Sequence, residues 1–60
     1  MESLNARLKR LRKQTGLSQA KFAEKFEIPK NTLQDWEQER RTPPVYVVGM
    51  IEKILENERE

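Results

Sequence analysis

The stretch "LSQAKFAEKFEIPKNTLQDWEQ", residues 17–38, decides the fold, because its apolar residues follow two short helical periods instead of one. These residues recur at helix spacing in two groups, Phe22, Ala23 and Phe26, then Leu33 and Trp36. Between the groups, at residues 27–29, the period breaks, and no strand alternation replaces it. The pattern predicts two short helices that meet at a sharp corner.

The composition limits what so short a chain can do. A chain of 60 residues makes one domain, 1–60, with a small core. Its 35% hydrophobic content is enough for folding although 37% of the residues are charged. The sequence has no Cys and no His, so disulfides, thiolate metal sites and the usual neutral-pH proton shuttle are excluded. We expect no metal, no cofactor and no enzymatic activity.

Membrane and export signals are absent from the printed sequence. No apolar run approaches the length of a membrane span, and the N-terminus "MESLNARLKR" lacks the apolar core of a signal peptide. We therefore expect a cytoplasmic protein with no membrane partner.

Charge is distributed unevenly along the chain. Residues 1–30 carry eight Lys and Arg against three Asp and Glu, a balance of +5, and residues 31–60 carry four against seven, a balance of −3, which together give the net +2. A basic half favours a polyanionic partner, and the acidic end should face away from it. The alternative is an ordinary solvated surface rich in Lys and Arg.

Capping signals divide the chain into four helical segments. Ser3 can cap a first helix on which Leu4, Leu8 and Leu11 share one face, with Gly16 as its stop. Ser18 can cap a second helix that runs to about residue 26.

Prolines mark the other two helical starts. Pro29 suits the first turn of a third helix over about residues 29–38, because it has no amide to leave unpaired there. Thr42 is the predicted cap of a fourth helix over about residues 43–56, with Pro43 and Pro44 in its first turn. The sequence predicts an all-α fold.

The third helix should present a polar face to solvent. If Leu33 and Trp36 face the second helix, the opposite side carries mainly amides and one carboxylate, at Asn31, Gln34, Asp35 and Gln38. Asn and Gln both donate and accept hydrogen bonds, as the major-groove edge of adenine requires. A merely solvated helix would more often carry Glu and Lys four residues apart.

Residues 19–38 resemble the twenty-residue helix-turn-helix signature of the phage repressor and Cro type, the XRE-like family. The resemblance extends to "RLKRLRKQTGLSQ" at residues 7–19 and "DWEQERRTP" at residues 35–43, and covers roughly residues 4–45. It implies a small four-helix, lambda-repressor-like domain that binds double-stranded DNA, with its third helix in the major groove. The implied function is a small prokaryotic or phage transcriptional repressor.

The resemblance also assigns roles to residues. The positions implied to read bases are Lys30, Asn31, Thr32, Gln34 and Asp35. The positions implied to contact phosphates are Ser18, Gln19, Gln38, Arg40 and Arg41, and we expect Arg10 to be free to reach a phosphate as well. Arg12 and Glu37 occupy the places of a partly buried ion pair in relatives.

Several of these roles have simpler alternatives. Gln34 and Asp35 can be merely solvent-exposed, and Lys30 can contact a phosphate instead of guanine. Arg40 and Arg41 can belong to an ordinary polar loop.

Three positions depart from the family pattern. Glu27 and Glu39 stand where relatives have Gly at the two ends of the third helix, and a positive φ there would cost roughly 1 kcal/mol at each. Pro29 replaces the hydroxyl residue that often caps that helix.

Apolar residues of the fourth helix cover an arc of about 160°, more than one small core requires. We expect a homodimer through this helix, with contacts from Tyr46, Val47, Met50 and Ile54. One alternative is that these residues only close the core of the monomer. Another is an antitoxin-type interaction module whose fourth helix binds a partner toxin.

Overall fold

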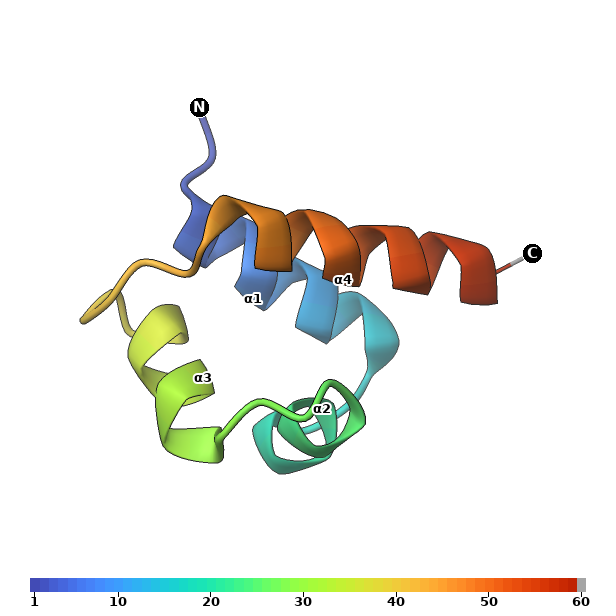
Figure 1. Cartoon of the computed structure of the whole chain (residues 1–60), viewed down its shortest axis with the longest axis horizontal. Coiled ribbons are helices and arrows are strands. Elements are labelled where there is room, and N and C mark those ends of the chain that lie inside the picture. The colour runs from blue at the N-terminus through green and yellow to red at the C-terminus, as the bar shows by residue number, and fades with distance from the viewer. Residues whose placement is uncertain (60) are drawn as a thin grey trace.

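Four α-helices make up the computed structural model, which describes residues 1–59. They are α1 (Leu4–Thr15), α2 (Gln19–Lys25), α3 (Lys30–Glu37) and α4 (Val45–Glu58). Figure 1 shows α1 and α4 along one side of the molecule, with α2 and α3 on the other. No strand occurs within residues 1–59, and the predicted all-α fold is confirmed.

The caps predicted for the first two helices are present. The Ser3 hydroxyl accepts a hydrogen bond from the Ala6 amide at 3.1 Å, and the Ser18 hydroxyl accepts one from the Lys21 amide at 3.1 Å. Gly16 ends α1 with a φ of 76°, the left-handed conformation that glycine adopts without strain. Local side-chain chemistry thus sets these three boundaries.

The two proline-marked starts differ from the prediction. Pro29 is the N-cap of α3 and not part of its first turn, and no side chain caps that helix. The prediction of Thr42 as the cap of α4 was wrong, because Pro44 takes that place and the helix covers Val45–Glu58 instead of 43–56. A proline disfavours helical geometry in the residue before it, so Pro44 keeps Pro43 out of the helix, and Pro44 itself is the N-cap with a ψ of 140°.

Two glutamates adopt left-handed backbone conformations at the ends of the third helix. Glu27 has a φ of 56° between α2 and α3, and Glu39 has a φ of 64° after α3. At each place the next amide donates to a carbonyl five residues earlier, from Ile28 to Ala23 at 2.8 Å and from Arg40 to Asp35 at 2.9 Å. These are helix-ending turns that ordinarily carry glycine, so the predicted strain is present.

The core lies between α1 and the other three helices. Its buried side chains are Leu8, Leu11, Phe22, Ala23, Leu33, Val48 and Ile51. Helix α1 packs against both α3 and α4, and α2 packs against α3. Trp36 packs against this core, with Leu33 fully buried beside it on the same face of α3. The opposite face of α3 is therefore turned outward.

Replacing Glu27 or Glu39 with glycine should stabilise the domain. Each substitution removes the steric cost of a left-handed Cβ, so the free energy of unfolding should rise by about 1 kcal/mol per site. Urea denaturation followed by circular dichroism measures the change.

Glu24→Gly is the matched control, because Glu24 is an exposed carboxylate within the regular turns of α2. It should lower the free energy of unfolding by about 1 kcal/mol. Equal destabilisation by all three substitutions would contradict the assignment of strain to residues 27 and 39.

Candidate nucleic-acid interface

The outward face of α3 carries the residues predicted to read bases. Lys30 and Asn31 are exposed, and Thr32, Gln34 and Asp35 are partly exposed. Helix α3 has no acidic residue in its first turn, so the positive end of its dipole is not neutralised locally. Its eight residues span about 12 Å, close to the width of the DNA major groove. This face is thus polar and of suitable size for a groove.

A buried ion pair holds the end of α3 against α1. Arg12 donates to Glu37 from Nε to Oε2 at 2.7 Å and from Nη2 to Oε1 at 3.0 Å. Its Nη1 also donates to the Leu17 carbonyl at 3.0 Å, and Gln19 Nε2 donates to Glu37 Oε1 at 3.2 Å. Only 2% of the Glu37 side chain is exposed. One carboxylate therefore ties together α1, the start of α2 and the end of α3.

The surroundings of Glu37 stabilise its charged form. Burial by itself raises the pKa of a carboxyl group, but the hydrogen bonds from Arg12 and Gln19 and the charge of Arg12 more than offset it. The pKa of Glu37 is therefore lowered below its ordinary value. Lys9 adds a smaller effect in the same direction.

Asp35 lies beside the two arginines of the following loop. Arg40 Nη1 is 3.6 Å from Asp35 Oδ1, and Arg41 Nε is 3.9 Å from Asp35 Oδ2. A residue predicted to read a base thus contacts two residues predicted to bind phosphates. These pairs neutralise a carboxylate that a nearby DNA backbone would otherwise repel.

The other predicted phosphate ligands differ in how free they are. Arg10 was expected to be available, but both its Nε and its Nη2 donate to the carboxylate of Glu2, at 2.9 and 3.0 Å. The hydroxyl of Ser18 already caps α2, and one amide hydrogen of Gln19 goes to Glu37, which leaves its other amide hydrogen available. Gln38 is exposed directly after α3.

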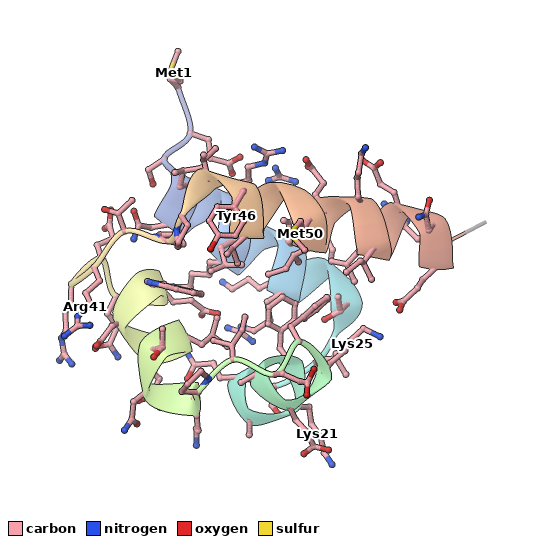
Figure 2. All side chains as sticks on the ribbon, in the orientation of Figure 1. Met1, Lys21, Lys25, Arg41, Tyr46 and Met50 are labelled. Carbon is pink, nitrogen blue, oxygen red and sulfur yellow. The ribbon has the colours of Figure 1, made fainter. Side chains whose placement is uncertain are left out.

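Basic side chains flank α3 on both sides. Lys21 projects into solvent from α2, and Arg41 projects from the loop that follows α3 (Figure 2). Lys25 is less free, because its ammonium group is 2.9 Å from Glu58 Oε2.

Asn5 is a structural residue that sequence reasoning missed. It is buried, and its Nδ2 donates to the carbonyls of Trp36 and Arg41, both at 2.7 Å. These bonds join the first turn of α1 to both ends of the segment 36–41, which carries Gln38 and Arg40. The sequence signal that could have indicated its burial is its position three residues before Leu8, on the buried face of α1.

Helix α4 exposes three apolar side chains that follow one another at four-residue spacing on one face, here called the α4 patch: Tyr46, Met50 and Ile54. Val45, at the start of the helix, is also exposed. Tyr46 is 68% exposed and Met50 58% exposed, and both lie on the same side of the helix (Figure 2). Val47, also predicted at the dimer interface, is partly buried against the core, so less of its side chain is available to a partner. It precedes Ile51 by one helical turn and shares its inward direction.

The pattern that defines the helix-turn-helix family matches residues 8–59. The chain belongs to this family. The resemblance to phage repressor and Cro-type proteins is therefore confirmed, and the helix-turn-helix family is one of DNA-binding regulators, not typically of enzymes. Searches of curated proteins and of solved structures found no match. Within the described residues, no helix has the length and apolar character needed to cross a bilayer.

Breaking the buried ion pair from one side should destabilise the helix-turn-helix domain strongly. Arg12→Ala leaves the Glu37 carboxylate buried without its main partner, so the free energy of unfolding should fall by about 3 kcal/mol. Urea denaturation measures this loss. Arg10→Ala removes a guanidinium from the exposed pair with Glu2 and should change little. Similar losses in both variants would contradict the special role of the buried pair.

Glu37 should also make stability depend on pH. Because its pKa is lower in the folded than in the unfolded state, its contribution is fully present above the unfolded-state pKa and is lost as the pH falls through the folded-state value. The free energy of unfolding should therefore decline as the pH falls below the ordinary pKa of a glutamate, about 4.5. In Glu37→Gln this decline should be shallower, and identical slopes for both proteins would contradict the lowered pKa.

Proposed function

We propose that the chain is a transcriptional repressor that binds a specific double-stranded DNA operator by inserting α3 into the major groove. The observation that carries the proposal is the division of α3 into an inward face with Leu33 and Trp36 and an outward face rich in amides. The family match supports DNA as the partner. Repression needs no further surface, because a bound protein blocks other proteins from the same DNA. The cytoplasm is the compartment we propose.

Specificity and affinity come from different residues. The proposed base readers are those on the outward face of α3, Lys30, Asn31, Thr32, Gln34 and Asp35. Gln19, Gln38, Arg40 and Arg41, together with Ser18 and Arg10, are the proposed phosphate ligands, and Arg10 must first leave Glu2. Phosphate contacts fix the position of the protein, and base contacts select the sequence.

We further propose that the protein binds DNA as a homodimer through the α4 patch. Helix α3 spans only a few base pairs, so a pair of copies is needed to recognise a long site. The domain measures 33 × 27 × 18 Å, so two copies bound one DNA turn, ~34 Å, apart have room to lie side by side. A two-fold axis through the α4 patch would cover its exposed apolar side chains.

An antitoxin-type module is the second candidate, and the α4 patch favours it equally well. A partner toxin would cover Tyr46 and Met50 in place of a second copy. Selection of bound duplexes from a random pool, followed by gel shifts at several salt concentrations, separates the two functions. A repressor enriches a two-fold-symmetric site, whereas failure to enrich any sequence at any salt concentration favours the protein-binding role.

Substitutions on the two kinds of DNA contact should have different effects. Asn31→Ala should relax the base preference at one position in each half-site, with a loss of about 1–3 kcal/mol on the selected duplex and little change on random DNA. Arg41→Ala should weaken binding to all duplexes alike and reduce the slope of log K against log salt by about one. Gel shifts on both duplexes measure these effects.

Lys53→Ala is the matched control for Arg41→Ala, because Lys53 is an exposed cation on α4, away from α3. It should leave the salt slope almost unchanged. The reverse pattern, with Asn31→Ala acting uniformly and Arg41→Ala acting on one base, would contradict the assignment of the two faces.

A further inference from the structure

We infer that Asp35 makes the phosphate contacts of Arg40 and Arg41 dependent on base identity. In the free protein its carboxylate holds both guanidinium groups, and on DNA a base amino group must replace them before they can turn fully to phosphates. The inference rests on the proposed DNA-binding function and adds a specificity-determining role to it.

The first support is the unequal exposure of the three side chains. The side chain of Asp35 is 29% exposed, whereas those of Arg40 and Arg41 are 70% and 76% exposed. The separations of 3.6 and 3.9 Å are those of loose ion pairs, with one arginine at each carboxylate oxygen. The arginines are thus free to turn away, but the carboxylate, on a short side chain of α3, cannot follow them.

The second support is the fixed backbone of the loop. The amides of Arg40 and Arg41 donate to the Asp35 carbonyl at 2.9 and 3.4 Å, and Asn5 Nδ2 donates to the Arg41 carbonyl at 2.7 Å. The loop backbone is therefore anchored both to α3 and to α1. The guanidinium groups can therefore exchange the Asp35 carboxylate for phosphates by side-chain rotation alone, without movement of the loop backbone.

The electrostatic consequence follows from this geometry. When phosphates take the two guanidinium groups, the Asp35 carboxylate is left close to the DNA backbone without a counter-charge, which is unfavourable. The N4 amino group of cytosine can donate to an aspartate in the major groove, whereas guanine offers only acceptors there. Full arginine–phosphate contact is thus favourable only where the base beside Asp35 offers an amino donor.

Glu39 provides a matched control for this carboxylate. It is exposed and immediately precedes Arg40, yet among residues 1–59 it forms no ion pair. Glu39→Gln removes an equal charge from the loop that carries Arg40 and Arg41, without releasing either arginine. The comparison between Asp35→Asn and Glu39→Gln therefore separates partner exchange from simple charge repulsion.

The test uses two probes, a duplex selected by the wild-type protein from a random pool and a random-sequence duplex. Asp35→Asn should bind the random duplex about fivefold more tightly. Its ratio of selected to random affinity should fall about tenfold, the size of one base contact. Repeated selection with this variant should lose the preference for an amino-bearing base at one position. Glu39→Gln should raise the affinity for both duplexes by the same factor, so the ratio of selected to random affinity should stay unchanged.

A second background tests the exchange itself. In the double variant Arg40→Gln/Arg41→Gln, adding Asp35→Asn should raise the affinity for the random duplex no more than adding Glu39→Gln does. Thermal unfolding by circular dichroism checks that each variant is folded.

Two results would overturn the inference. If Asp35→Asn and Glu39→Gln change both duplexes by equal factors while the wild type discriminates, Asp35 is an ordinary surface charge and only the inference fails. If the wild type selects no sequence, the proposed function is wrong, and the inference, which rests on it, is wrong as well.

Discussion

The carboxylate of Glu37 is almost completely buried, and its position depends on three donors from Arg12 and Gln19. Because a charge in that position is tolerated only with its partners in place, α1, the start of α2 and the end of α3 are held in one arrangement. Asn5 adds two bonds from α1, one to the Trp36 carbonyl in α3 and one to the Arg41 carbonyl in the loop that follows α3. The orientation of α3, and with it any reading of DNA, depends on these polar contacts in addition to the small apolar core.

Local rules predicted much of the fold. Ser3, Gly16 and Ser18 mark helix ends through bonds within one turn, so their roles are visible in the sequence. The start of α4 was misplaced because the second of two prolines restricts the first, an effect that a capping rule for a single proline overlooks. Asn5 was missed because its partners lie 31 and 36 residues away, at backbone carbonyls that no side-chain pattern reveals.

The candidate site was predictable to a similar extent. Periodicity placed Leu33 and Trp36 inward and thereby defined the outward face of α3. The ion pairs of Asp35 were harder to predict from the sequence. The contacts of Asp35 with Arg40 and Arg41 depend on the left-handed turn at Glu39, which brings the loop back over the last turn of α3. The roles of individual side chains on DNA remain predictions, since they depend on a partner molecule.

The absence of a side-chain cap on α3 has an evolutionary consequence. Its position is set by Leu33, Trp36 and Glu37 on the inside and by the backbone turns at both ends, so Asn31 and Gln34 contribute little to folding. Mutations at these two positions can therefore accumulate without loss of the domain. Under the proposed function, duplicated copies of such a gene could diverge toward new operators through a few outward substitutions, which would yield mutually insulated regulators on one unchanged scaffold.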